Sequence, residues 1–215
     1  AALDKRTAQD FPEYALLTHP QSVSMRQVQE LLKPDEALAQ LSFLNQGLIV
    51  WFVTQKAVGW SKLPVSADAI DSKFDALVCG LDASRWEIGG KRSCQSVLNT
   101  SFTAEDARKG RRLPFDVVNA YEIYRQVFAP FEQALKNSDG SWKQLILAPG
   151  TFVSIPFQTL VTEDPARAIS SQGTDFRAVK WLGTRQAITV IPSIAGFKAL
   201  RSAARPSTAT EPFLG

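Results

Sequence analysis

The sequence is poor in the residues that most metal centres require. Its 215 residues include one histidine, His19, and two cysteines, Cys79 and Cys94. A single histidine excludes a histidine-rich zinc or iron site, and two thiols exclude a four-cysteine zinc or iron–sulfur site. We therefore predict neither metal ligands nor cofactor-binding residues in this chain.

Excess charge of one sign and long apolar runs are also missing. The chain has 24 Lys and Arg against 21 Asp and Glu, a formal net charge of +3, which is small for a dedicated nucleic-acid-binding protein. No apolar run reaches the roughly 18 residues of a membrane-spanning helix, and the start lacks a signal-peptide pattern. We expect no nucleic acid and no membrane among the partners. Since Met25 is the only methionine, we expect a processed product or an excised piece.

What is present is ordinary globular composition, 45% hydrophobic and 21% charged, with a readable order of elements. Ser24 and Gln27 have the spacing of a capping box at the start of a short helix. Three runs rich in Val, Ile, Phe and Trp follow, at 38–44, 48–54 and 57–63. Short runs of this composition around turn residues predict an antiparallel strand meander.

Two amphipathic helices are predicted after the meander. Ser66 caps the first, which carries apolar residues at helical spacing as far as Leu81. The second runs from about 114 to 136, with Val118 among its buried residues and Pro130 marking a kink or a boundary. Residues 82–112 lie between them and show little periodicity, so we expect a long irregular connection, which we call the excursion.

The last third predicts a parallel α/β arrangement. Residues 145–148 and 186–191 read as strands buried on both faces, and Ser193 caps a final helix. We divide the chain into a lead-in segment and short helix (1–34), a front subdomain with the meander and two helices (35–137), and the first strands and helix of a second sheet (138–215). Two strands and one helix do not close such a sheet, so we expect this part to be truncated.

None of the candidate chemical residues points to catalysis. His19 has no orienting partner nearby in the sequence, and a nucleophilic thiol needs a base close to it. Cys79 and Cys94 are therefore either a mutual disulfide or two buried small hydrophobic residues. The turn at 149–151 lacks the spacing of a phosphate loop or a nucleophile elbow. The basic run at 108–112 is expected to be a solvated loop, because no aromatic residues interleave with it.

The ordered set of short motifs resembles the front half of a bacterial CHAT domain, a caspase-like domain usually found after tetratricopeptide repeats. The resemblance covers about residues 30–215. Its motifs are Lys33–Leu38, Cys79–Asp82, Leu113–Asp116 with Ala120–Tyr124, Leu145–Gly150, Ile155–Leu160 and Ile188–Ser193.

The resemblance implies an incomplete caspase-like three-layer sandwich, preceded by the antiparallel meander with its helices. In this clan of cysteine peptidases a His-Cys dyad attacks the peptide carbonyl. Both members are expected beyond Gly215, so no catalytic residue is assigned in this chain. The implied partners are the C-terminal catalytic half or another copy of the chain, because a sheet stopped here exposes an edge and an apolar face. Protein partners or a peptide substrate of the parent are also implied.

Two functions remain open at this point. The chain is either the non-catalytic front part of a peptidase domain, or a protein-interaction or regulatory scaffold with no proteolytic role. A free-standing small-ligand α/β domain is a weaker third possibility. A bridge between Cys79 and Cys94 would place a bacterial parent outside the cytoplasm, and free thiols would place it in the cytoplasm.

Overall fold

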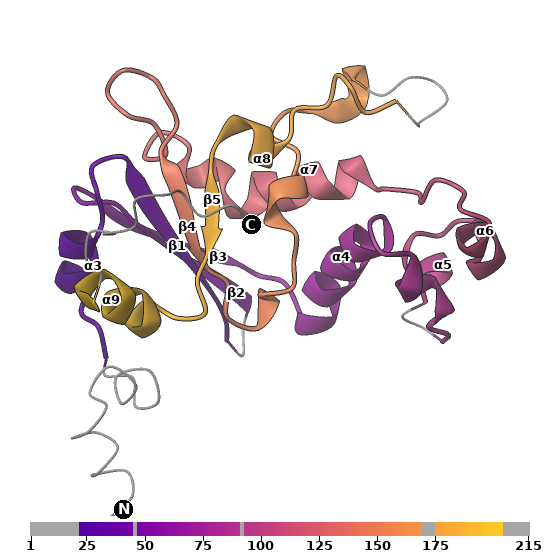
Figure 1. The fold of residues 1–215 in the computed structure, drawn as a ribbon, viewed down its shortest axis with the longest axis horizontal. Coiled ribbons are helices and arrows are strands. Elements are labelled where there is room, and N and C mark those ends of the chain that lie inside the picture. The colour runs from indigo at the N-terminus through magenta and orange to yellow at the C-terminus, as the bar shows by residue number, and fades with distance from the viewer. Residues whose placement is uncertain (1–21, 45–46, 91–92, 169–174, 204–215) are drawn as a thin grey trace, which may run out of the picture.

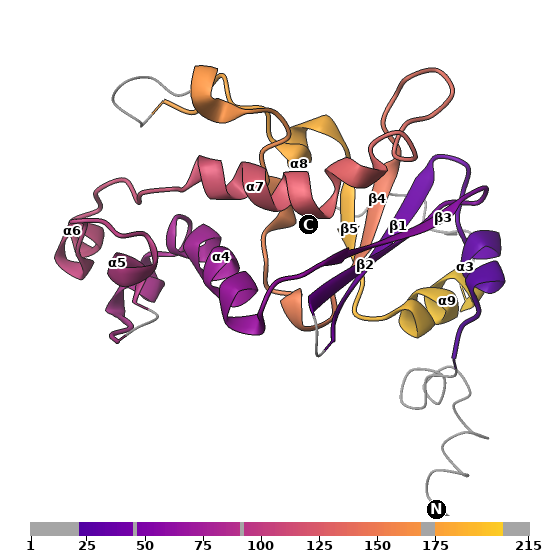
Figure 2. The same cartoon turned by 180° about the vertical axis from the view of Figure 1, so that it is seen from behind.

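The computed structural model describes residues 22–44, 47–90, 93–168 and 175–203. They form an α/β fold around one five-stranded mixed sheet of order β3-β2-β1-β4-β5 (Figures 1 and 2). The strands are β1 (Glu36–Leu44), β2 (Gly47–Val53), β3 (Val58–Leu63), β4 (Gln144–Ala148) and β5 (Ile188–Val190).

The predicted antiparallel meander is confirmed. β1 pairs antiparallel with β2, and β2 pairs antiparallel with β3. β4 then adds to β1 in parallel, with Leu38 opposite Ile146, and β5 adds to β4 in parallel. One sheet therefore crosses the expected boundary at residue 137, and the division into a front subdomain and a second region stays a prediction.

Two helices contribute to the main core on one face of the sheet. α4 (Ala67–Cys79) is capped by Ser66, as predicted, and α7 (Val117–Val127) is capped by Asp116. The two helices meet where the Asn119 amide donates to the Lys73 carbonyl at 2.7 Å and Lys73 pairs with Glu122. Alternate strand residues complete this main core, including Ala39, Val50, Phe52, Leu145 and Leu147.

The other face carries the two terminal helices of the described chain. α3 (Met25–Leu31) begins with the predicted capping box of Ser24 and Gln27, and α9 (Ile194–Ala203) lies beside it (Figure 1). Together they cover Leu38, Val53 and Ile146. Because β4 sends Leu145 and Leu147 to one core and Ile146 to the other, it is buried on both faces, as its continuous apolar run predicts.

A buried ion pair ties α9 to the start of β1. The Glu36 side chain is 3% exposed, and Arg201 lies 2.5 Å from it. The backbone N–H of Lys33 donates to the second carboxylate oxygen at 2.8 Å. Both oxygens of this carboxylate therefore have a donor, which is the condition for burying it.

The excursion contains three short elements, the 3-10 helix η1 (Ala83–Glu87), α5 (Cys94–Val97) and α6 (Ala104–Arg108). It lies beyond α4, at the opposite end of the molecule from α3 and α9 (Figures 1 and 2). A disulfide joins Cys79 at the end of α4 to Cys94 at the start of α5. A satellite core of Cys79, Trp86 and Cys94, with Leu98, Phe102 and Leu113 against it, gives the excursion its own packing.

Three sequence predictions are wrong in detail. The second helix is shorter than 114–136, because α7 ends at Val127. Pro130 does mark a boundary, as predicted, since it lies in a separate 3-10 turn, η2 (Ala129–Phe131). Val118 is 52% exposed, because α7 turns Ala120 and Ile123 toward the sheet instead. Residues 186–191 are not a buried strand. β5 has three residues and lies at the sheet edge, with Val190 41% exposed.

Between β4 and β5 the chain forms short turns instead of long helices. They are the 3-10 turns η3 (Gly150–Phe152), η4 (Phe157–Thr159) and η5 (Pro165–Arg167), followed by the one-turn helix α8 (Leu182–Arg185). The η4 turn lies within the motif Ile155–Leu160. Its Phe157 is fully buried against Phe74 and Phe128, so the connection is anchored in the main core.

Candidate functional site

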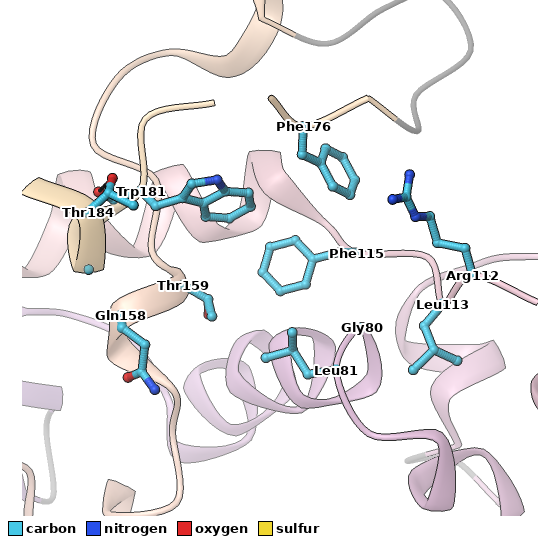
Figure 3. A pocket seen from close by; sticks show the side chains of 11 residues that line it. Gly80, Leu81, Arg112, Leu113, Phe115, Gln158, Thr159, Phe176, Trp181 and Thr184 are labelled. Atoms are coloured by element: carbon cyan, nitrogen blue, oxygen red, sulfur yellow. Dashed lines mark hydrogen bonds between the residues drawn. The ribbon is translucent and has the colours of Figure 1, made fainter. Parts of the chain in front are cut away.

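A hollow of about 610 Å³ with aromatic lining lies where the excursion, the start of α7 and the β4–β5 connection meet (Figure 3). We call it the aromatic pocket. Its size lies in the range of small-molecule sites. It is lined by Gly80, Leu81, Arg112, Leu113, Phe115, Gln158, Thr159, Phe176, Trp181, Gly183 and Thr184.

Three aromatic rings from two segments form one wall of the pocket: Phe115 from one, and Phe176 and Trp181 from the other. Phe115 lies edge-on to Trp181 and to Phe176, with ring centroids 5.7 and 6.4 Å apart. Phe176 and Trp181 are also edge-to-face, at 6.2 Å. Each ring holds the other two in the favoured edge-to-face arrangement, so the wall is preformed.

Two glycines allow the backbone segments to approach closely enough to build the pocket. A side chain at Gly80 would place its Cβ 2.6 Å from the Phe115 ring and 2.8 Å from the Phe115 Cα. A Cβ at Gly183 would lie 2.7 Å from the Gln158 Cβ and 3.0 Å from the Gln158 carbonyl oxygen. These distances exclude larger residues unless the backbone moves, so both glycines set the width of the pocket.

The charged residues near the pocket lie at its rim. Arg112 is the one charged residue among those that line it. Asp175, next to Phe176, accepts three side-chain hydrogen bonds from Arg177, and these bonds lower the pKa of Asp175 to about 2. The Asp175 carboxylate is therefore ionised at neutral pH.

A second hollow of about 500 Å³ adjoins the aromatic pocket and shares Trp181 and Thr184 with it. We call it the basic hollow, because Lys136, Lys180 and Arg185 line it against Glu132 and Glu163. A third hollow of about 340 Å³ shares Lys136 with the basic hollow. It is lined by Lys56, Lys136 and Lys143 together with uncharged residues.

Arg185 is the fixed centre of the basic hollow. Its guanidinium carbon lies 3.7 Å from the Trp142 ring centre and 5.0 Å from the Tyr124 ring centre. It donates to the Tyr124 hydroxyl at 2.8 Å and pairs with Glu132 at 3.4 Å, while the Tyr124 hydroxyl donates to Glu132. Burial and the bond to Glu132 raise the pKa of Tyr124. These contacts fasten α8, and with it Trp181 and Thr184, to α7.

The carboxyl ends of the parallel strands β4 and β5 lie away from these hollows. In parallel α/β sheets, ligands and reacting groups gather at the carboxyl ends of the strands. β4 ends at Ala148 and turns through Gly150, whose φ of +61° favours glycine. β5 ends at Val190 and leads to Ser193, whose hydroxyl accepts from the Gly196 N–H at 3.0 Å and caps α9. The basic hollow is lined by Trp142, which precedes β4, so this hollow lies toward the amino-terminal ends of the parallel strands.

The structure joins Cys79 and Cys94, the pairing that the sequence left as one of two alternatives. His19 lies outside the described residues. The basic run is a surface segment whose charges are mostly paired: Arg108 bonds Glu87, Lys109 lies near Glu105, and Arg111 bonds Asp106. Glu87 and Asp106 consequently have lowered pKa values, through the hydrogen bonds from these arginines.

Comparison with known proteins adds no assignment: the chain matches no protein-family model and no curated protein. Within the described ranges no group of three or more His, Cys, Asp or Glu residues is placed to hold a metal ion. None of the helices in those ranges has the length and apolar character needed to cross a membrane.

Sequence analysis missed the aromatic pocket. Phe115 lies within the predicted helix range 114–136, but it precedes α7 and faces the pocket. Phe176 lies in the polar stretch 163–179 and Trp181 just after it, where no helix or strand was predicted. The available signal was two large aromatic residues close to that stretch, since exposed loops seldom carry them without a packing or binding role.

Proposed function

We propose that this chain is the non-catalytic front part of a CHAT-type, caspase-like cysteine-peptidase domain, with the resembling motifs as the basis of the family assignment. In this proposal the chain supports a His-Cys dyad supplied by residues outside it. The fold proposed is a caspase-like three-layer sandwich in which further strands add beside β5.

The open edge at β5 is the observation that carries the proposal. In the described chain β5 pairs only with β4, in parallel, and it is followed by a helix that crosses to the α3 face. A strand, a crossover helix and a further parallel strand form the unit that extends such sheets. Val190 is exposed at this edge, and an unpaired edge strand favours addition of another strand.

The proposed catalytic step belongs to the parent domain. A histidine would take the proton from the cysteine thiol, and the thiolate would attack the peptide carbonyl. Cys79 and Cys94 take no part, because each sulfur is already bonded to the other. The disulfide also favours an oxidising, extracytoplasmic location for the parent.

The test reads the parent gene downstream of the codon for Gly215 and then assays the longer protein. We expect a histidine after one predicted strand and a cysteine after the next, with that cysteine labelled by a peptidyl acyloxymethyl ketone. Replacing the histidine should abolish labelling. The 215-residue chain alone should cleave no peptide, and cleavage blocked by a thiol reagent would contradict the proposal.

A protein-interaction scaffold is the second candidate function, and the aromatic pocket favours it. The pocket is preformed by three interlocked rings and is built from segments outside the sheet. Absence of either dyad residue from the longer sequence would leave this function in place of peptidase support.

A further inference from the structure

We propose that the three hollows form one docking track for an extended acidic peptide segment that carries a bulky apolar side chain at one end. The apolar side chain would occupy the aromatic pocket, and the acidic residues would follow through the basic hollow toward Lys56 and Lys143. This inference goes beyond the proposed function, because it concerns binding by the chain itself and needs no catalytic dyad.

Shared lining residues place the three hollows next to one another. The aromatic pocket and the basic hollow have Trp181 and Thr184 in common, and the basic hollow and the third hollow have Lys136 in common. A row of hollows suits an extended chain, which places successive side chains about 3.3 Å apart along its length, better than it suits one compact small molecule.

The apolar end of the track suits a large side chain. The aromatic pocket is about 610 Å³ and is walled by Phe115, Phe176 and Trp181. Leu81, on its lip, is 48% exposed (Figure 3). Burying a Trp, Phe or Leu side chain there removes apolar surface from water on both partners. Trp is also enriched among the residues that carry most of the binding energy at protein interfaces.

The charged side chains along the track favour an acidic peptide. Of the charged residues that line the three hollows, six are basic and two are acidic. Lys136 lies 4.9 Å from the Trp142 ring centre, and Lys143 bonds the uncharged oxygens of Pro34 and Asn137. These ammonium groups can still attract carboxylates, and such complementarity sets partner specificity and association rate.

A peptide fits the track better than a nucleic acid. Proteins that bind single strands offer aromatic faces on which bases stack. Here the rings meet edge-to-face with one another, at interplanar angles of 66° to 89°. Glu132 and Glu163 also line the basic hollow and would repel a phosphate backbone at close range.

Binding to the 215-residue chain is measured by fluorescence anisotropy with a labelled synthetic peptide containing one Trp, a Gly and four Glu. We expect saturable binding that weakens at least tenfold when the peptide's Trp is replaced by Ala, or when its Glu residues are replaced by Lys. Equal binding of the Trp and Ala peptides, or no binding at millimolar protein, would overturn the proposal. So would tighter binding of a labelled oligouridine of the same length.

Two matched pairs of variants locate the site on the protein. Leu81→Ser should weaken binding about fivefold or more, while Leu200→Ser, at a leucine 62% exposed on α9, should leave it unchanged. Lys180→Glu should weaken binding at least tenfold, while Lys62→Glu on β3 should not. Because Leu81 and Lys180 are both exposed, these variants should fold. Equal effects within either pair would place binding elsewhere and refute the track.

Discussion

Removing the Cys79–Cys94 disulfide should destabilise the excursion by an amount that follows from loop closure. The two cysteines are 15 residues apart, and closing a loop of that length lowers the entropy of the unfolded chain by an amount equivalent to about 3 kcal/mol. The Cys79→Ala/Cys94→Ala variant removes the bridge while keeping two small apolar side chains in the satellite core. Since about 1.4 kcal/mol corresponds to a factor of ten, the equilibrium constant for local opening of the excursion should increase by roughly two orders of magnitude.

The loss should be confined to one part of the molecule. Cys79, Trp86 and Cys94 form a core separate from the one beneath the sheet, so the excursion can open while the sheet stays folded. Hydrogen exchange followed by mass spectrometry should show roughly hundredfold faster exchange in residues 83–113 and unchanged exchange in β1 and β4. The Trp86 indole N–H, which donates to the Cys79 carbonyl at 2.8 Å, reports on the same opening.

The control is the unaltered chain with and without reductant. Its intact mass should rise by two hydrogens on reduction, and its exchange should then match that of the double variant. Reductant should change nothing in the variant. An unchanged mass would show that the two thiols are not bridged. Uniform loss of protection throughout the sheet would show that the excursion is part of one cooperative unit, contrary to the separate packing described above.

Three further predictions concern single contacts. Stability should fall as pH rises above about 10, because the raised pKa of Tyr124 favours its neutral form in the folded state. In urea unfolding measured between pH 9 and 11, Tyr124→Phe should make the free energy of unfolding less dependent on pH. An unchanged pH dependence would show that other groups cause the loss of stability. Leu145→Ala, at a fully buried site, should lower the free energy of unfolding by about 3 kcal/mol. Leu200→Ala, at an exposed site, should lower it by less than about 0.5 kcal/mol, and similar losses for the two variants would contradict the core assignment. Arg201→Gln should lower the free energy of unfolding by about 2 kcal/mol, which is less than for a fully buried pair because the Arg201 side chain is 28% exposed. If the unpaired Glu36 carboxylate causes this loss, adding Glu36→Gln should recover part of the stability.

Local sequence signals predicted the elements whose causes are local. Ser24 and Gln27 cap α3 from within one turn of chain, and Ser66 caps α4 in the same way. The run 145–148 predicted a strand buried on both faces because every side chain in it is apolar. Such signals depend on neighbours in the sequence.

The predictions that failed depended on neighbours in space. Val118 and Ala120 lie on different sides of α7, and the sheet packs against the side with the small alanine. Residues 186–191 are apolar enough for a central strand, yet the strand order leaves β5 at the edge. Periodicity gives the spacing of a face along an element, but it does not say which partner covers that face.

By itself, the sequence determined the order of the longer helices and the strands, the antiparallel meander and the scarcity of metal-ligating residues, since these follow from composition and local pattern. The Cys79–Cys94 pairing and the aromatic pocket were decided by the tertiary structure. Phe115, Phe176 and Trp181 lie up to 66 residues apart in the chain. They meet because Gly80 and Gly183 let their backbones approach and because Arg185 fastens α8 to α7. Because Phe115 is far in the sequence from Phe176 and Trp181, only the packing of these two segments could bring the three rings into one site.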